Sequence, residues 1–216
     1  MEVIFRMVRG GGSGEIVEKK SRFIADIRQV DSETEALAFT EEIRKKYWDA
    51  RHHCSAFIIG KERPLARSSD DGEPQGTAGR PMLEVLNGAD LRGVCAVVTR
   101  YFGGVLLGTG GLTRAYSGAC AAGLAACTVL DVYPGRRVSV ECDYSDYGKI
   151  RYMADIPGIT CTETGYTDKV RMAFLIREDL CGGFIADVTN ASGGRAITGC
   201  SDKVYLADDG TGFILV

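Results

Sequence analysis

The sequence lacks several of the local patterns that identify common classes of protein. Its eight cysteines form no Cys-x-x-Cys pair, and Cys95, Cys120 and Cys142 fall at apolar positions, where a reduced cysteine acts as a small hydrophobic side chain. No apolar run reaches the roughly 20 residues that a membrane span needs, and the first residues lack a signal-peptide pattern. We therefore expect a reduced protein of the cytoplasm that does not enter a membrane.

An excess of positive charge is also lacking. Residues 1–134 carry 17 lysines and arginines against 17 acidic residues, and residues 135–216 carry 9 against 12, which gives a net charge of −3. Domains dedicated to nucleic acids usually have a basic face. The composition therefore excludes a strongly basic binding protein, and any contact with RNA must come from a local patch.

A glycine-rich segment, Arg100–Tyr116, is the most informative part of the chain. Five glycines lie between Gly103 and Gly111, after an apolar run and before a run of small residues, which predicts a buried strand, a loop and a helix. Glycine allows backbone N–H groups to approach a ligand closely, and a helix N-terminus adds unpaired donors and partial positive charge. With Arg100 and Arg114 at its edges, the segment could bind an anion such as phosphate.

Two observations limit this interpretation. The segment lacks the Gly-Lys-Ser/Thr ending and the G-x-G-x-x-G spacing of the common nucleotide-binding loops. Its glycines also suit a helix that packs closely on a sheet, as do Gly118 and Gly123 within the expected helix. The adjacent rings of Tyr101 and Phe102 could stack a nucleic-acid base, or one could face the core while the other covers the loop.

Acidic and histidine side chains form two further candidate groups. Asp70, Asp71 and Glu73 could bind a cation such as Mg²⁺. We expect instead that Asp70 or Asp71 caps the turn before Gly72-Glu-Pro74, or pairs with Arg67, Arg80 or Arg100. His52 and Cys54 lie two residues apart on an expected strand and so share a face, where they could form a nucleophilic pair. No second cluster of histidines and cysteines is present to complete a metal site. We expect a hydrogen-bonded histidine, and predict no catalytic residue, metal ligand or cofactor.

The chain is expected to form two domains, residues 1–134 and 137–216, joined by a linker at Tyr133–Gly135. The first mixes strands and helices in an α+β sandwich, and its clearest helix begins at a capping box, Ser32-x-x-Glu35. The second follows the ferredoxin-like order βαββαβ. The expected strands are 14–18, 22–30, 53–59, 94–99, 138–144, 159–166, 170–177 and 199–206, and further helices are expected at 77–86, 147–155 and 179–191.

Four segments, in order along the chain, resemble the signature of the YigZ/IMPACT family. They are Lys20-Ser-Arg-Phe-Ile-Ala25, Asp49-Ala-Arg-His-His-Cys-Ser-Ala56, Asp70-Asp-Gly-Glu-Pro-Gln-Gly-Thr-Ala-Gly-Arg-Pro81 and the stretch from Arg100 to Tyr116. The part after about residue 137 resembles the small C-terminal domain of the bacterial members, through weaker motifs. The resemblance implies a first domain like those of ribosomal proteins, GHMP kinases and elongation-factor domain IV, and a second domain like elongation-factor domain V.

The chain departs from that signature at Leu106, where the bacterial members usually carry a lysine. The loop thereby loses a cation that would contact a phosphate backbone, while Arg100 and Arg114 remain. We therefore expect this loop to bind nucleic acid less strongly than the loops that have the lysine.

The resemblance implies a non-enzymatic regulator of translation that contacts the ribosome, RNA or a translation factor. In the eukaryotic branch, which has a different extra domain, it implies a part in a stress response, as a competitor for the activator of a starvation-response kinase. The alternative is an enzyme acting on a phosphorylated or nucleotide-like small molecule, which the same loop and acidic cluster would suit. The candidate binding residues are Arg100, Tyr101, Phe102, Gly103, Gly104, Gly108, Gly110, Gly111 and Arg114, with Asp70, Asp71, Glu73 and His52.

Overall fold

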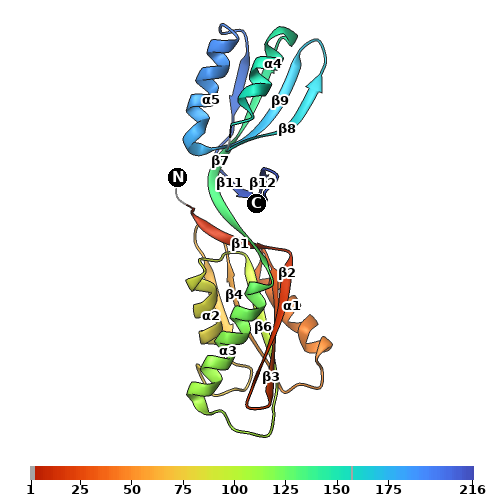
Figure 1. The fold of residues 1–216 in the computed structure, drawn as a ribbon, viewed down its shortest axis with the longest axis vertical. Helices are drawn as coiled ribbons and strands as arrows, with labels where there is room; N and C mark the ends of the chain where they lie inside the picture. Colours follow the sequence, from red (N-terminus) through yellow and green to blue (C-terminus); the bar gives the residue numbers. More distant parts are fainter. Residues whose placement is uncertain (1–2, 157) are drawn as a thin grey trace. The chain divides into compact units, whose positions relative to one another are not determined.

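The computed structural model describes residues 3–156 and 158–216 and has a mixed α+β fold (Figure 1). The chain divides into two compact units, one formed by Phe5–Leu130 and the other by Asp131–Val216 with Val3 and Ile4. The division falls between Leu130 and Asp131, ahead of the expected linker. Among the described residues, no helix is both long enough and apolar enough to cross a membrane.

The first unit is built on an antiparallel sheet with the strand order β2-β3-β6-β4-β5. Strand β6 lies in the middle and is buried at every residue but its last. The elements of this unit are β1 (Phe5–Arg9), β2 (Gly11–Glu18), β3 (Ser21–Gln29), α1 (Glu33–Lys46), β4 (His52–Ile59), β5 (Leu65–Ser69), α2 (Gly79–Gly88), β6 (Val94–Tyr101) and α3 (Gly108–Ala125).

The two faces of this sheet pack against different helices. On β6, Val94, Ala96 and Val98 pack with residues of α2 and α3, whereas Cys95 and Val97 pack with residues of α1. Figure 1 shows α2 and α3 on one side of the sheet and α1 on the other. Because successive side chains of a strand point to opposite faces, a strand covered on both sides needs apolar residues at every position. The uninterrupted apolar run in the sequence of β6 follows from this requirement.

Helix α1 begins as its sequence predicts. The Ser32 hydroxyl accepts a hydrogen bond from the Glu35 N–H at 3.2 Å, and the Glu35 carboxylate accepts one from the N–H of Asp31 at 2.8 Å. These reciprocal bonds satisfy two backbone donors at the start of the helix. The predicted apolar positions Phe39 and Ile43 are buried against the sheet.

The second unit contains the predicted βαββαβ order, and its sheet runs β10-β7-β9-β8 with antiparallel neighbours. Strand β11 pairs with the first part of β7 and with β12. Helices α4 and α5 cover one face of the sheet through Ile150 and Phe184, while Leu206 and Phe213 pack on Leu175 in a separate cluster. The elements are β7 (Thr128–Cys142), α4 (Tyr144–Met153), β8 (Ile159–Tyr166), β9 (Val170–Arg177), α5 (Glu178–Ala191), β10 (Ile197–Cys200), β11 (Val204–Asp208) and β12 (Phe213–Leu215).

The expected linker at Tyr133–Gly135 is wrong, because these residues lie within β7 and pair with Val204–Leu206 of β11. Proline is tolerated in a strand where its nitrogen does not have to donate to a neighbouring strand. Gly135 is required for close packing and not for a turn, since a Cβ at this position would overlap the Leu206 side chain. Residue types that are typical of turns therefore serve a continuous strand here.

The expected strand at 199–206 is also wrong, because it is two strands, β10 and β11, separated at Ser201–Lys203. The Ser201 N–H donates to the Arg137 carbonyl at 2.9 Å, and its hydroxyl accepts from the Arg137 N–H at 2.9 Å. These bonds fix the chain to β7 at the point where β10 ends and before β11 begins to pair with the same strand. Strands β1, β5 and β12 were not expected from the sequence. Strand β5 is exposed at every residue, so it has no apolar alternation that would reveal it.

Candidate binding surface around the glycine-rich loop

The glycine-rich segment joins the end of β6 to the start of α3, as predicted. Helix α3 begins at Gly108, so Gly108, Gly110 and Gly111 lie in its first turn and not in the loop. Leu107, at the N-cap position, makes no side-chain hydrogen bond to the helix, and this residue therefore leaves the first N–H groups of α3 uncapped. Gly108 and Gly110 are exposed, so the helix N-terminus is open to solvent.

Gly103 and Gly104 have different structural reasons to be glycine. Gly103 lies against the turn between β2 and β3, where its N–H donates to the Ser21 hydroxyl at 3.1 Å and a Cβ would overlap the backbone of Lys20. Gly104 has a φ of +82°, in the left-handed region that favours glycine. The close approach at Gly103 brings the β2–β3 turn beside the loop.

Lys19 and Lys20 form that turn, with φ values of 44° and 66°. Positive φ at both central residues is typical of a type I′ hairpin turn, in which Asn and Gly are preferred. Lysine is strained in this region of backbone conformation. Both lysines are exposed, and the described residues offer them no ion-pair partner. The turn thus presents two unpaired cations beside Gly103.

Arg100, which was expected at the edge of an anion site, is only 7% exposed. Its Nη1 donates to Oε1 of Glu73 at 2.6 Å, and the Tyr116 hydroxyl donates to the same oxygen at 2.8 Å. The guanidinium carbon lies 5.4 Å from the ring centroid of Phe23 and 5.6 Å from that of Phe102. Arg100 therefore connects the end of β6 to the acidic segment and to α3, from beneath the surface.

Asp70 binds backbone donors. Its carboxylate accepts hydrogen bonds from the N–H groups of Gly76 at 2.8 Å, Ala78 at 3.0 Å and Gly79 at 2.8 Å, the last being the first residue of α2. Burial raises the pKa of this carboxyl, but the three backbone hydrogen bonds outweigh burial and hold the pKa below its usual value. This arrangement matches the capping role that the sequence suggested for the acidic segment.

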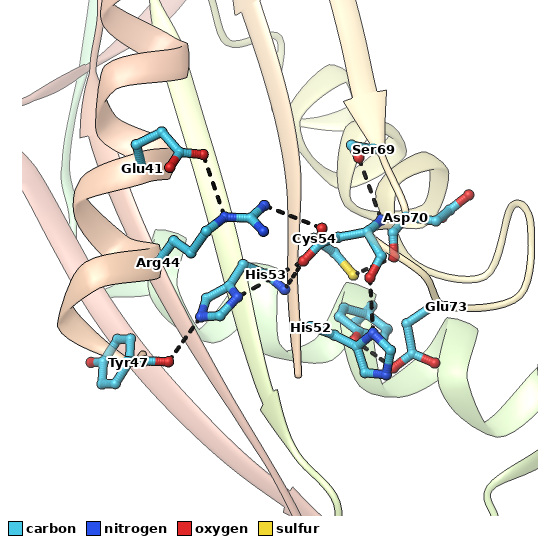
Figure 2. Close-up of polar contacts among 11 residues, drawn as sticks. Glu41, Arg44, Tyr47, His52, His53, Cys54, Ser69, Asp70 and Glu73 are labelled. Carbon is cyan, nitrogen blue, oxygen red and sulfur yellow. Dashed lines mark hydrogen bonds and ion pairs between the residues drawn. The ribbon is translucent and has the colours of Figure 1, made fainter. Parts of the chain in front are cut away.

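Asp71 joins the same segment to β4 and α1. Its Oδ2 accepts from the His53 N–H at 2.6 Å, and its Oδ1 accepts from Arg44 Nη2 at 3.1 Å. The ring of His52 lies against this segment (Figure 2), and its Nδ1 is 2.8 Å from the carbonyl oxygen of Asp71. Because a carbonyl oxygen only accepts, Nδ1 of His52 is the donor in this bond. The expectation of a hydrogen-bonded histidine is confirmed.

The thiol of Cys54 also donates a hydrogen bond to a carbonyl oxygen of the acidic segment. It is fully buried and donates to the carbonyl oxygen of Asp70 at 3.0 Å. Burial raises the pKa of this thiol far above its ordinary value, so Cys54 stays protonated and is not an activated nucleophile. Within the described residues, no group of three or more His, Cys, Asp or Glu side chains is arranged to hold a metal ion.

Large apolar side chains are exposed around the loop. Phe102 is 56% exposed, Leu106 84% and Trp48 81%. The hydroxyl of Tyr101 donates to Oδ1 of Asp49 at 2.7 Å, which brings the segment that contains Trp48 beside the end of β6. Single exposed apolar residues are common on proteins, whereas several around one loop suggest an interaction site.

Two unpaired arginines complete the surface. Arg114 is exposed on α3, with its Nη1 3.7 Å from the position that a Cβ on Gly110 would take. Arg51 is exposed and precedes His52, which pairs with Arg100 in the sheet. Neither arginine has an ion-pair partner among the residues that the structure describes. We call the following set the loop surface: Lys19, Lys20, Trp48, Arg51, Phe102, Leu106 and Arg114.

Sequence reasoning identified only part of this surface. Phe102 and Arg114 were expected, whereas Lys19, Trp48 and Arg51 were not considered. Arg51 lies within a segment that resembles the family signature, and Trp48 directly precedes it. A charged or aromatic residue within or beside such a segment could therefore have been named as a candidate binding residue from the sequence.

Comparison with known proteins matches two family models to the chain. The Impact N-terminal domain matches residues 19–124, and a domain of unknown function, DUF1949, matches residues 140–195. The chain is 39% identical over 199 residues to the IMPACT family member YvyE of Bacillus subtilis, with 92% of each chain covered. It is 44% identical over 128 residues to the IMPACT family member YigZ of Escherichia coli, covering 58% of this chain and 63% of that one. A crystal structure of a hypothetical protein is 31% identical, covers 92% of this chain and 97% of its own, and superposes with a TM-score of 0.57.

Proposed function

Because the chain belongs to the IMPACT family, we propose that it is a non-enzymatic regulator of translation that binds ribosomal RNA through the loop surface. The role in translation is implied by the resemblance of the sequence to this family. The choice of RNA over a protein partner rests on the chemistry of the loop surface.

The observation that carries this proposal is the presence of exposed rings and unpaired cations beside the end of β6 and the glycine-rich loop, which leads into the open N-terminus of α3. Trp48 and Phe102 offer faces on which bases can stack, a contact worth about 1–3 kcal/mol per base in single-stranded nucleic-acid sites. Lys19, Lys20 and Arg114 carry charges that no acidic side chain of the described residues neutralises. Phosphate groups would pair with these charges and with the N–H groups at the start of α3.

The buried candidate residues have an indirect part in this proposal. Arg100 and Glu73 hold the end of β6 to the acidic segment, and Asp70 holds that segment to the start of α2. Asp71 and His52 bind the same segment to β4. We assign these five residues to positioning of the loop surface, while Gly108, Gly110 and Gly111 keep the N-terminus of α3 accessible.

The test is co-sedimentation of the protein with bacterial ribosomes over a series of salt concentrations. Each phosphate contact adds about 0.9 to the slope of the logarithm of the binding constant against that of the salt concentration on duplex DNA, and slightly less on single strands. We expect Arg114→Ala to lower the slope by about one contact. The matched control is Arg63→Ala, because Arg63 is also exposed and unpaired but lies in the β4–β5 turn, at the other end of β4 from His52.

The possible outcomes separate the competing functions. Binding that weakens with salt, and weakens further in Arg114→Ala but not in Arg63→Ala, supports the proposal. Binding that survives on ribosomes but is insensitive to salt would instead favour a protein partner. Absence of binding at low salt would overturn the proposal. A thermal-shift panel of nucleotides with and without Mg²⁺ would then test the enzyme, since a ligand at a hundredfold excess over its Kd stabilises a protein by about 2.7 kcal/mol.

A further inference from the structure

Two cysteine side chains of the second unit lie next to each other. Cys181, in the first turn of α5, and Cys200, at the end of β10, have their Sγ atoms 3.7 Å apart. The two residues are separated by 19 positions in the sequence, so they form no local motif and are brought together only by the fold. Both are free thiols.

The two thiols differ in their access to solvent. Cys200 is exposed and Cys181 is buried. Cys200 pairs with Val138, whose side chain packs beneath α5, so the thiol of Cys200 lies on the sheet face that carries Cys181. A small solute therefore meets Cys200 first, and Cys181 lies behind it within reach of its sulfur.

Arg136 supplies positive charge to this pair. Its Nη2 donates to Oε1 of Glu178 at 2.8 Å and its Nη1 donates to the carbonyl oxygen of Ser201 at 3.0 Å, which fixes the guanidinium. Burial, followed by the hydrogen bond with Cys200, raises the pKa of Cys181 to about 11, and the charge of Arg136 opposes this rise. Cys181 is therefore mainly a thiol, and it suits the second step of a two-cysteine reaction, in which it meets the Cys200 sulfur 3.7 Å away.

We propose that Cys181 and Cys200 are a site of reversible disulfide formation by hydroperoxides. The Cys200 thiolate attacks the peroxide, so that an S–O bond forms, the O–O bond breaks and, with hydrogen peroxide, one water leaves. Cys181 then attacks the Cys200 sulfur, the S–S bond forms, the S–O bond breaks and a second water leaves. Two electrons pass from the two thiols to the peroxide, and a dithiol reductant reverses the change.

The bond would link α5 to β10. The sulfur atoms must approach from 3.7 Å to about 2.0 Å, a movement on the scale of a side-chain rotation. Closing a loop of about 20 residues lowers the conformational entropy of the unfolded chain, so oxidation stabilises the second unit. The proposal is independent of the loop surface, which belongs to the first unit.

The test treats the full chain with hydrogen peroxide, blocks the remaining thiols, digests it with trypsin without reduction and analyses the peptides by mass spectrometry. Peptides 178–195 and 196–203 each contain one cysteine, and we expect them to be joined. Unfolding by heat should show a higher midpoint for the oxidised chain, by several degrees, and dithiothreitol should abolish the increase.

Variants separate the two roles. In Cys181→Ser, Cys200 should remain a sulfenic acid that dimedone labels, because the second thiol is missing. In Cys200→Ser, neither the joined peptides nor the shift of the midpoint should appear. Cys161→Ser is the matched control, since Cys161 is partly exposed in the same unit, and it should behave as the unmodified protein. No joined peptide, or joining of Cys181 and Cys200 no more often than of other cysteines, would overturn the proposal.

Discussion

Arg100 and Glu73 form a buried ion pair, with Nη1 and Oε1 2.6 Å apart and side chains 8% and 3% exposed. Arg100 is the next-to-last residue of β6, and Glu73 lies in the segment that precedes α2. The pair therefore ties together two of the segments that resemble the family signature. Tyr116, in a third position of the signature, donates to the same carboxylate oxygen.

Removing one partner of this pair should strongly destabilise the folded protein. In Arg100→Ala, the Glu73 carboxylate stays buried with the Tyr116 hydroxyl as its remaining donor among the described residues. We expect the free energy of unfolding to fall by about 3–5 kcal/mol, because a buried charge loses its partner. Urea unfolding followed by circular dichroism measures this loss.

An exposed pair provides the control. Arg22 and Glu15 are joined by an ion pair whose side chains are 53% and 39% exposed, and solvent screens such a pair. Arg22→Ala should leave the unfolding midpoint nearly unchanged. Equal losses in Arg22→Ala and Arg100→Ala would contradict the role assigned to the buried pair.

Asp70 should make the stability of the first unit depend on pH. Its folded-state pKa is held below the unfolded value of about 3.9 by three backbone N–H groups. A carboxyl of this kind contributes stability that is fully present above the unfolded pKa and is lost as the pH falls through the folded pKa. We therefore expect Asp70→Asn to be less stable than the unmodified protein at pH 7, by about 1–3 kcal/mol.

The pH dependence of that difference is the diagnostic result. Urea unfolding at several pH values between about 2.5 and 7 should show the two proteins converging below pH 4, because the unmodified carboxyl becomes protonated there. Arg80 and Glu84 form an exposed pair on α2, so Glu84→Gln is a control that should show little loss at any pH. A difference that stays constant down to pH 2.5 would contradict the role given to the Asp70 carboxylate.

The sequence predicted the local elements better than the contacts between them. Helix α1 and the strand–loop–helix order at the glycine-rich segment depend on neighbouring residues, and both were predicted. A pair between Arg100 and Asp70 or Asp71 was expected as one alternative, but the partner is Glu73, 27 residues away, because only the tertiary fold decides which carboxylate of the segment reaches Arg100. The same reason applies to Cys181 and Cys200, which are 19 positions apart and form no local motif.

Turn-forming residue types were misleading where they serve packing. Pro134 and Gly135 suggested a linker, but Gly135 is needed because Leu206 occupies the space of a side chain. Conversely, Lys19 and Lys20 do not suggest a tight turn, yet they form one. Residue type alone does not distinguish a glycine that is needed for a turn from one that is needed because a neighbouring side chain packs against it.

Leu106 offers a gain-of-function test of the proposed RNA contact. Its side chain is 84% exposed, so a lysine at this position would meet no steric obstacle and would add one cation to the loop surface. We expect Leu106→Lys to bind ribosomes more tightly at low salt and to increase the salt slope by about one contact. Co-sedimentation over the salt series measures both changes.

The control adds the same charge elsewhere. Leu65 is 39% exposed on β5, and Leu65→Lys should leave the salt slope unchanged. If Leu65→Lys strengthened binding as much as Leu106→Lys, then net charge and not the loop surface would explain the effect.

Substitutions in the strained turn at Lys19 and Lys20 should change protein stability and ribosome binding in opposite directions. Asn and Gly suit a turn with positive φ at both positions, so the double variant Lys19→Asn/Lys20→Gly should be more stable, by roughly 1–3 kcal/mol. The same variant removes two cations from the loop surface, and we expect weaker ribosome binding with a salt slope lower by up to about two contacts. The free energy of unfolding would thus rise while the fraction of protein that co-sediments with ribosomes falls.

A variant that relieves strain away from the loop surface shows whether stability itself affects binding. Asp90 has a φ of +53° and lies between α2 and β6, near the end of β6 that is opposite the glycine-rich loop. Asp90→Gly relaxes the backbone there without touching the loop surface, so ribosome binding should not change. If the double variant became more stable and still bound ribosomes with an unchanged salt slope, Lys19 and Lys20 would have no part in binding. Their strained conformation would then need another explanation.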